Sequence, residues 1–396
     1  MEEAIGEGQG AAVAHRPANP LPPDADRLSR ERLMAGHRQN GPEAEEKRKT
    51  RGKMSGDGAN NGVKPGGTDE PGGSVLRAGA TVTVFGGSGF LGRHTVQALA
   101  RRGYRVRVAV RRPNEAQFLR PMGAVGQVEP VQANIRDDAS VAAALEGADA
   151  VVNLVGILHE SGKQKFAAVQ AEGASRIALA AVAAGISSFV HVSAIGADPE
   201  SPSAYARSKA EGEAGVRAAL PGAIILRPSI VFGPEDDFFN RFAALARLSP
   251  VLPLIGGGLT RFQPVYVKDV AEAIATVLER DDAAGRIYEI GGPEVETFRE
   301  LMERLLREIG RTRVLVPVPF AAARLKAAFL QLLPTPPLTV DQVRMLAVDN
   351  VVSDAAMAEG RTLEGLGIQP TAMVAILQSY LYRFRRTGQF KRASAS

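Results

Sequence analysis

The chain has 396 residues, with 48 Lys and Arg against 43 Asp and Glu, a formal net charge of +5, and no Cys. Its length allows a large buried core and about two to three domains. The lack of Cys excludes disulfides, a thiol nucleophile and thiolate metal ligands. The five His residues are scattered, without a pair at helical ligand spacing beside a carboxylate, so we expect no metal site.

Residues 1–76 differ in composition from the rest: they are rich in Gly, Pro, Asn and mixed charge and poor in aromatic and β-branched residues. Such a segment lacks the side chains that build a core, which predicts a disordered N-terminal tail. Its basic run at 47–53 is typical of a solvated segment rather than a nucleic-acid patch. Early acidic residues argue against a transit peptide, and no apolar signal segment appears, which favours a bacterial, cytoplasmic protein.

An alternating run of β-branched residues, Thr81–Phe85, passes directly into glycines spaced three apart. This pattern predicts a strand, a phosphate-holding turn and the start of a helix. Gly86 permits the tight turn, Gly89 lets the backbone approach a pyrophosphate, and Gly92 lets the helix pack on its strand. With a second strand at Arg105–Val110 the segment forms a βαβ unit, and a dinucleotide is the expected ligand. The other contacts expected from this turn are Ser88, Phe90, Leu91 and Arg93.

The second strand ends in Arg111 and Arg112, where an NAD-binding chain places a carboxylate on the adenosine ribose. Guanidinium groups at this point can hold a 2′-phosphate in bidentate fashion, which favours NADPH over NADH. Arg93 is placed to help with the same phosphate. A solvated basic loop is the alternative, because Arg-Arg-Pro after a strand is also ordinary turn composition.

From Thr81 onward the chain alternates strands and helices, which predicts an α/β fold with a doubly wound parallel sheet. Further strands are expected at 105–110, 128–131, 150–155, 189–193 and 223–226. The apolar stretch 177–192 fits a buried helix followed by a strand, so no transmembrane helix is predicted. Ligands in such sheets bind at the carboxyl ends of the strands, so these ends supply the candidate site residues.

Two strand ends supply candidate contacts to the adenosine half of a dinucleotide. Asn134 and Ile135 follow the third strand, where they can cap the adenine. Val155 and Gly156 end the fourth strand, where the backbone can meet the adenosine ribose. Asp137 or Asp138 is equally compatible with a helix N-cap that has no ligand role.

Candidate catalytic residues follow the fifth strand. Ser193 ends this strand, and Tyr205 and Lys209 lie one turn apart on the next predicted helix. An ammonium beside a phenol lowers the pKa of the phenol, so the pair can act as general acid and base toward a carbonyl. Lys209 would also hold the nicotinamide ribose, and the Ser193 hydroxyl would orient the oxygen. Tyr-x-x-x-Lys is also a common structural pattern on helices, which remains the alternative.

The segment Gly86–Arg93, together with Ser193, Tyr205, Lys209 and the later run Leu226–Pro234, resembles the extended or atypical short-chain dehydrogenases/reductases. The resemblance covers roughly residues 81–292. Within that superfamily, three segments are most similar to the NADPH-binding accessory subunits of respiratory complex I (NADH:ubiquinone oxidoreductase) and their bacterial relatives. These segments are 86–93, 153–158 and 263–271, and parts of the C-terminal region, at 333–339 and 349–352, look like the same relatives.

This resemblance implies a Rossmann-type fold with a small C-terminal α+β region for substrate or partner, and it adds Pro228 and Ile230 to the cofactor contacts. It implies a tightly held NADPH that is structural, in an accessory or assembly subunit of complex I on the cytoplasmic face of a bacterial inner membrane. Because Tyr205 and Lys209 are both present, a free-standing NADPH-dependent reductase or a sugar epimerase or dehydratase stays open as an alternative function.

The resulting domain prediction is a tail at 1–76, a dinucleotide-binding domain at 77–310 with substrate-side segments after about 222, and a helical, basic docking region at 311–396.

Charge gives an independent indication of a partner, because residues 301–396 hold 13 Lys and Arg against 7 Asp and Glu. An apolar stripe and an aromatic run with interleaved arginines, 380–386, suit an anionic membrane surface or an acidic partner subunit. A helix packed on the sheet with a basic outer face explains the same pattern. No nucleic-acid-binding motif accompanies the basic residues. The stripe consists of Phe320, Leu325, Phe329, Leu332 and Leu333.

Overall fold

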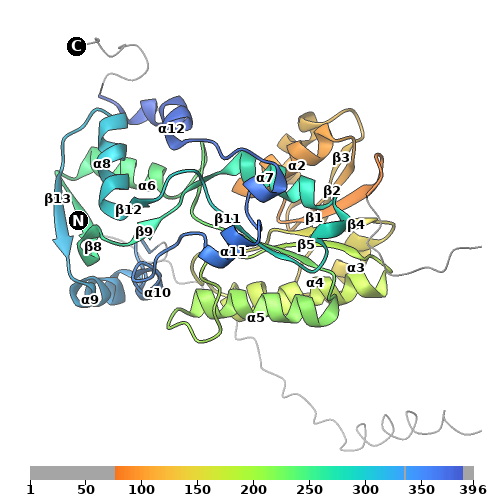
Figure 1. Ribbon diagram of the computed structural model, residues 1–396. Coiled ribbons are helices and arrows are strands. Elements are labelled where there is room, and N and C mark those ends of the chain that lie inside the picture. Colours follow the sequence, from red (N-terminus) through yellow and green to blue (C-terminus); the bar gives the residue numbers. More distant parts are fainter. Residues whose placement is uncertain (1–75, 334–335, 387–396) are drawn as a thin grey trace, which may run out of the picture. The chain divides into compact units, whose positions relative to one another are not determined.

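The computed structural model describes residues 76–333 and 336–386, and its centre is one parallel sheet of seven strands (Figure 1). The order across the sheet is β11-β6-β5-β4-β1-β2-β3, so β1 lies beside both β2 and β4. In this register Val82 is paired with Val106 on one side and with Ala150 on the other. The strands are β1 (Thr81–Phe85), β2 (Arg105–Val110), β3 (Val128–Gln132), β4 (Ala150–Asn153), β5 (Ser188–Val192), β6 (Ile224–Pro228) and β11 (Ile287–Ile290).

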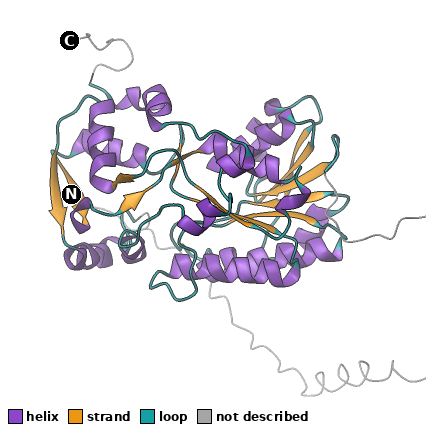
Figure 2. Cartoon of the chain, viewed as in Figure 1, coloured by secondary structure: helices purple, strands orange, loops and turns teal. Residues whose placement is uncertain are grey.

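Helices cover both faces of this sheet, as Figure 2 shows. Because successive side chains of a strand point to opposite faces, Val82 and Val84 pack into one core and Phe85 packs into another. The first core is closed by α2 (Phe90–Arg101) and α7 (Val267–Val277), and the second by α3 (Asp138–Leu145), α4 (Glu172–Ala183) and α5 (Ala204–Ala219). The predicted doubly wound α/β fold is confirmed. Two short helical segments, η1 (Pro113–Met122) and η2 (Ala167–Ala171), lie in the connections before β3 and α4.

A smaller α+β region follows β6 and has its own apolar core, around Phe232, Phe239 and Phe298. Its strand pairs are short and join segments far apart in sequence, such as β8 with β13. The strands are β7 (Val231–Phe232), β8 (Val251–Ile255), β9 (Arg261–Phe262), β10 (Val265–Tyr266), β12 (Glu296–Thr297) and β13 (Val314–Val318). The helices are α6 (Phe239–Leu248), α8 (Phe298–Glu308), α9 (Phe320–Leu330), α10 (Val340–Met345), α11 (Asp354–Ala358) and α12 (Met373–Leu381), with a final turn η6 (Tyr382–Phe384).

The predicted tail at 1–76 lies, apart from its last residue, outside the described residues, and the division into domains stays a prediction. Of the two C-terminal features expected to face a partner, the 380–386 run is partly buried: Tyr380, Leu381 and Phe384 lie in the core, while Tyr382, Arg383 and Arg386 are exposed. The stripe on α9 is different, because Leu325 and Phe329 are 65% and 69% exposed. Over the described ranges, no helix is long and apolar enough to cross a bilayer.

Candidate functional site

The turn after β1 has the geometry that its glycines predict. Gly86 has a φ of +78°, a conformation that glycine adopts without strain, and its N–H donates to Ala109 O at 3.2 Å. The turn is closed by a bond from Gly89 N–H to Gly86 O at 3.1 Å. Helix α2 then begins at Phe90, with no side-chain cap and no acidic residue in its first turn. Its first N–H groups are therefore free to bind an anion.

Position 92 accepts only glycine, because helix α2 and the turn approach each other closely there. A Cβ at this position would lie 2.4 Å from Gly86 O and 2.6 Å from the backbone of Gly87. A Cβ at Gly89 would lie 3.3 Å from the same Gly86 oxygen. Only hydrogen fits between α2 and the turn, which is the close packing of helix on turn that the glycine spacing predicts.

The end of β4 lies against this turn. A Cβ on Gly86 would be 3.3 Å from both Leu154 C and Val155 N, while Val155 N–H itself donates to Asn153 Oδ1 at 3.1 Å. The structure therefore brings Val155 beside the glycine turn. A Cβ on Gly156 would be 3.3 Å from Lys209 Nζ, which places the two candidate regions side by side.

Lys209 and Tyr205 share one face of α5, with Lys209 Nζ 6.0 Å from the centre of the Tyr205 ring. The ammonium donates to Val192 O at 3.2 Å. Ser193 Oγ is buried and has no hydrogen-bond partner among the described residues. A buried hydroxyl without a partner is costly, so the site has a free donor and acceptor for a ligand oxygen.

The expected effect of Lys209 on the phenol is wrong for the structure as it stands. Burial raises the pKa of Tyr205 to about 12, and burial lowers the pKa of Lys209 to about 8 against an opposing effect of Glu213. Burial removes water from the phenol and so disfavours the phenolate, and this loss of hydration is the cause of the raised pKa of Tyr205. Tyr205 is thus a protonated phenol at neutral pH, a donor rather than a base.

The arginines expected near the 2′-phosphate lie at the surface. Arg112 pairs with Glu115 at 3.0 Å, with its side chain 76% exposed, and Arg111 is exposed as well. Arg93 lies closer to the turn: its Nε donates to Gly89 O at 3.4 Å and its guanidinium stacks on Phe118. The role of all three in binding stays a prediction.

After β3, the alternative that Asp137 or Asp138 is a helix N-cap is confirmed for Asp137. Asp137 is the N-cap of α3, since its carboxylate accepts from Ser140 N–H at 2.8 Å. Asn134 Oδ1 accepts from Arg136 N–H at 3.2 Å, which leaves its amide N–H groups as the atoms that could face adenine. A Cβ on Gly173 would be 2.8 Å from Ile135 Cδ1, so Ile135 packs closely against α4.

Two C-terminal side chains that the sequence analysis did not assign, Asn350 and Asp341, hold parts of the site in place. Asn350 Oδ1 accepts from Ser229 Oγ at 2.7 Å and from Ile230 N–H at 3.1 Å, and its Nδ2 donates to Ile195 O at 3.1 Å. It therefore ties the loop after β5 to the end of β6, where Pro228 and Ile230 were expected. The only earlier signal was the similarity of the 349–352 segment to the relatives.

The second unassigned side chain is Asp341, which lies at the N-terminus of α5. Its carboxylate accepts from Ser203 Oγ at 2.8 Å, from Ala204 N–H at 2.7 Å and from Tyr205 N–H at 3.1 Å. A carboxylate at this end of a helix is favoured by the free N–H groups and the helix dipole. The C-terminal region thus fixes the start of the helix that carries Tyr205 and Lys209.

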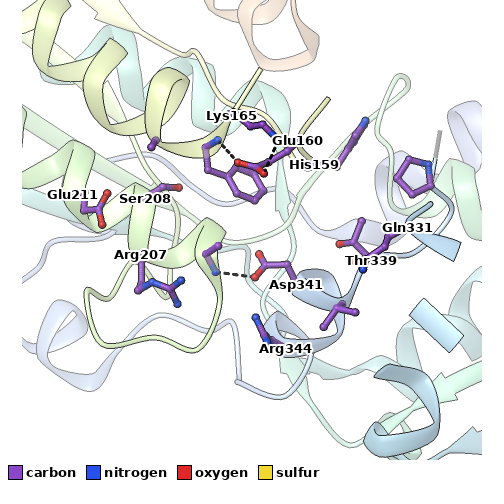
Figure 3. A pocket seen from close by; sticks show the side chains of 15 residues that line it. His159, Glu160, Lys165, Arg207, Ser208, Glu211, Gln331, Thr339, Asp341 and Arg344 are labelled. Atoms are coloured by element: carbon purple, nitrogen blue, oxygen red, sulfur yellow. Dashed lines mark hydrogen bonds and ion pairs between the residues drawn. The ribbon is translucent and has the colours of Figure 1, made fainter. Parts of the chain in front are cut away.

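A cavity of about 690 Å³ lies on the other flank of α5 (Figure 3). Phe166 lines it and also packs edge-to-face on Tyr205, with ring centres 5.9 Å apart, so this ring separates the cavity from Tyr205. Neither Tyr205, Lys209, Ser193 nor the glycine turn lines the cavity. Its charged lining includes Lys165, Arg207, Arg344, Glu160, Glu211 and Asp341.

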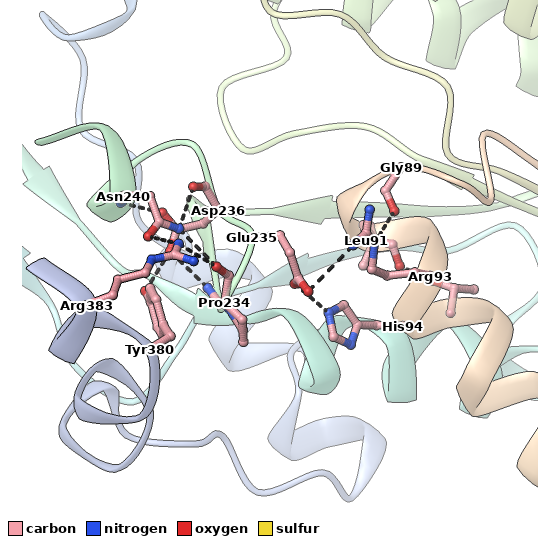
Figure 4. A network of polar contacts seen from close by, with 12 residues as sticks. Gly89, Leu91, Arg93, His94, Pro234, Glu235, Asp236, Asn240, Tyr380 and Arg383 are labelled. Carbon is pink, nitrogen blue, oxygen red and sulfur yellow. Dashed lines mark hydrogen bonds and ion pairs between the residues drawn. The ribbon is translucent and has the colours of Figure 1, made fainter. Parts of the chain in front are cut away.

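The loop between β7 and α6 connects the glycine turn to the C-terminal helix α12 (Figure 4). Glu235 lies 3.6 Å from Arg93 Nη1 and 3.4 Å from His94 Nε2. The next residue, Asp236, is buried and accepts from Tyr380 O–H at 2.6 Å. Burial raises the pKa of Asp236, although four hydrogen bonds to its carboxylate act in the opposite direction.

Comparison with known proteins agrees with this geometry. The model of the NAD dependent epimerase/dehydratase family matches residues 82–291. The chain is 37% identical over 329 residues to an Arabidopsis thaliana protein named "NADH dehydrogenase [ubiquinone] 1 alpha subcomplex subunit 9, mitochondrial", covering 80% of this chain and 81% of the relative. It is 32% identical over 321 residues to the "NADH-ubiquinone oxidoreductase 40 kDa subunit, mitochondrial" of Neurospora crassa, covering 81% and 83%.

A third relative, the "Ceramide reductase" of Caulobacter vibrioides, is 33% identical over 291 residues, covering 72% of this chain and 89% of the relative. The family model accounts for the glycine turn, the parallel sheet and the Tyr205–Lys209 helix together. This chain therefore belongs to the NAD-dependent epimerase/dehydratase family.

Proposed function

We propose that this protein binds NADPH as a structural ligand and acts as an accessory or assembly subunit of respiratory complex I. The observation that supports the proposal best is the length of the sequence match to a named complex I subunit. The match to the Arabidopsis subunit extends over 329 residues, well past the part of the chain at 82–291 that the family model covers. A match to 80% of this chain must include residues after 291, the part of the chain that supplies Asp341 and Asn350 to the site.

The site residues have defined roles in this proposal. The free N–H groups of α2, after Gly86, Gly89 and Gly92, hold the pyrophosphate, with Ser88, Phe90, Leu91 and Arg93 beside it. The Asn134–Ile135 and Val155–Gly156 segments border the adenosine. Tyr205 and Lys209 hold the nicotinamide ribose, and Pro228 and Ile230 border the nicotinamide. When bound, the cofactor supplies hydride chemistry; the chain's residues orient and enclose it.

The location we propose is the cytoplasmic face of a bacterial inner membrane, with the protein held peripherally. The printed names of the Arabidopsis and Neurospora relatives place those proteins in mitochondria. The basic surplus of the C-terminal region supports attachment to an anionic surface, because each basic side chain near such a surface contributes about 1 kcal/mol.

A test of the function is to purify the protein from its own membranes and identify its nucleotide by mass spectrometry. We expect NADPH to remain bound through purification and the protein to migrate with complex I on native gels. Tyr205→Phe removes one hydrogen bond to the ribose and should weaken NADPH binding only slightly, and it should leave migration with complex I unchanged, because a structural ligand does not need the phenolic proton for chemistry. Recovery only as a free protein whose nucleotide exchanges readily would contradict the proposal.

A free-standing reductase is the second candidate function, with a sugar epimerase or dehydratase as its variant. The unpartnered Ser193 hydroxyl favours it: Ser193 follows Val192, whose carbonyl accepts from Lys209 Nζ, and a Ser, Tyr and Lys trio can polarise and protonate a carbonyl. A turnover assay with the same Tyr205→Phe variant decides between the two: turnover of a carbonyl or sugar substrate that Tyr205→Phe abolishes would replace the first proposal by this one.

Selection of NADPH over NADH is predicted to depend on Arg111 and Arg112. The double variant Arg111→Ala/Arg112→Ala should lose about 10- to 100-fold in affinity for NADPH and little for NADH, because one or two charge-assisted contacts to the 2′-phosphate disappear. Calorimetric titration with both nucleotides measures the ratio. Arg217→Ala, an exposed arginine on α5, is the matched control. An unchanged ratio would mean that these two arginines form only a solvated loop.

A further inference from the structure

A second cavity, of about 680 Å³, opens where α8 turns into β13, and arginine dominates its lining. Arg299 and Arg307 come from α8, and Arg311 and Arg313 come from the turn that follows. Glu303 is the one carboxylate in the lining. None of the four arginines forms an ion pair with a carboxylate in the part of the chain that the structure describes.

Backbone carbonyls hold two of these guanidinium groups in place. Arg311 Nε donates to Phe384 O at 3.0 Å, and Arg313 Nε donates to Ala246 O at 2.7 Å. These bonds fix the two side chains and leave their charge uncompensated. The arrangement is therefore a preformed cationic site and not a set of freely moving surface arginines.

More positive charge lies nearby. Burial lowers the pKa of Arg311, and repulsion from Arg313, Arg386 and Arg247 lowers it further. Like charges gathered in this way destabilise the fold unless an anion neutralises them. Because the planar guanidinium fork matches two oxygens of a phosphate group, a phosphate-bearing ligand suits the cavity better than a single carboxylate.

Apolar side chains continue from the cavity along the same edge. Val314 follows Arg313 directly and is 63% exposed, and Leu248, at the end of α6, is 88% exposed. In Figure 1, β13 forms the outer edge of this region and leads from the α8 end to α9, whose Leu325 and Phe329 are also exposed, as is Leu332 just after the helix. Basic side chains beside exposed apolar ones match a lipid–water interface, where phosphates and acyl chains lie next to one another.

We propose that this cavity binds the phosphate of an anionic phospholipid at a bilayer surface, while Leu248 and Val314 contact the adjoining apolar region. The inference deepens the proposed peripheral location, and it is tested without complex I or nucleotide, so the two can fail separately. Leu248 and Val314 are more exposed than the aromatic side chains of the 380–386 run, of which Tyr380 and Phe384 are buried and Tyr382 is 36% exposed.

The test is sedimentation of the full chain with vesicles of phosphatidylcholine alone or mixed with phosphatidylglycerol. We expect binding only to the mixed vesicles, decreasing with added salt. Arg307→Gln/Arg311→Gln should weaken this binding by about 30-fold, as expected for the loss of two basic side chains at an anionic surface. Arg120→Gln/Arg217→Gln removes the same charge from exposed positions on η1 and α5 and should change the binding little.

Two further measurements distinguish a specific phosphate site from general electrostatic attraction to the vesicle surface. Soluble glycerol phosphate should compete only weakly, because it lacks the apolar contact, and Leu248→Ser/Val314→Ser should weaken vesicle binding without changing its salt dependence. Equal loss in both arginine double variants, or equal binding to vesicles without phosphatidylglycerol, would overturn the inference. If thermal unfolding shows that the Arg311 variant is destabilised, Arg307→Gln alone, at an exposed position, carries the test with about a 5-fold loss expected.

Discussion

Replacing Gly92 by Val is expected to abolish dinucleotide binding. The new Cβ would lie 2.4 Å from Gly86 O and 2.6 Å from Gly87, and all of these contacts are with backbone that cannot rotate away. Helix α2 must then move off the turn, which displaces the N–H groups that face the pyrophosphate. A displacement of about 1 Å in a site of this kind costs about 100-fold, and we expect at least that loss of affinity for NADPH by calorimetry.

The matched control is Gly222→Ala, since a Cβ at Gly222 has no heavy atom within 4 Å and its backbone is not left-handed. This variant should bind like the unmodified protein. Gly92→Ala, with the same crowding but a smaller side chain, separates loss of binding from loss of folding if Gly92→Val unfolds. Normal affinity in a folded Gly92→Ala protein would show that the nucleotide does not depend on this turn.

The second large effect is expected at a buried ion pair between α5 and β6. Arg227 donates to both carboxylate oxygens of Glu213, at 2.9 Å and 2.6 Å, and the side chain of Glu213 is 6% exposed. The same carboxylate raises the pKa of Arg227. Arg227→Met would leave the Glu213 charge buried without a partner, so we expect the free energy of unfolding in urea to fall by about 3 to 5 kcal/mol.

Two comparisons make this result specific. Arg112→Met breaks the exposed pair with Glu115, whose side chains are 76% and 67% exposed, and should cost less than about 1 kcal/mol. Glu213→Leu/Arg227→Met removes both charges and should recover much of the lost stability. A single Arg227→Met variant as stable as the parent would mean that Glu213 reaches water or takes up a proton in the folded protein.

The regular part of the fold was predictable because its signals are local. Each of the six expected strands lies within a few residues of its place, since β-branched alternation and the turn glycines act over short distances. β11 was not among the expected strands, because the short run Ile287–Ile290 is defined by its pairing with β6. The two-residue strands of the C-terminal region escape sequence analysis for the same reason.

The site residues also divide into those with a local sequence signal and those without one. Gly86, Gly92, Tyr205 and Lys209 come from motifs within one turn or one helix, and the structure gives the turn the expected geometry and places the pair on one helix face. The contribution of Asp341 depends on bonds to residues 136 to 138 positions earlier, for which no local pattern exists. The direction of the Tyr205 pKa shift also needs the structure, since it depends on how much water reaches the phenol.

The hydrogen bonds that the start of α5 donates to Asp341 also have a consequence for folding during synthesis. The helix that carries Tyr205 leaves the ribosome long before the carboxylate that completes its first turn. The first turn of this helix therefore acquires its capping carboxylate only after the C-terminal region has been synthesised.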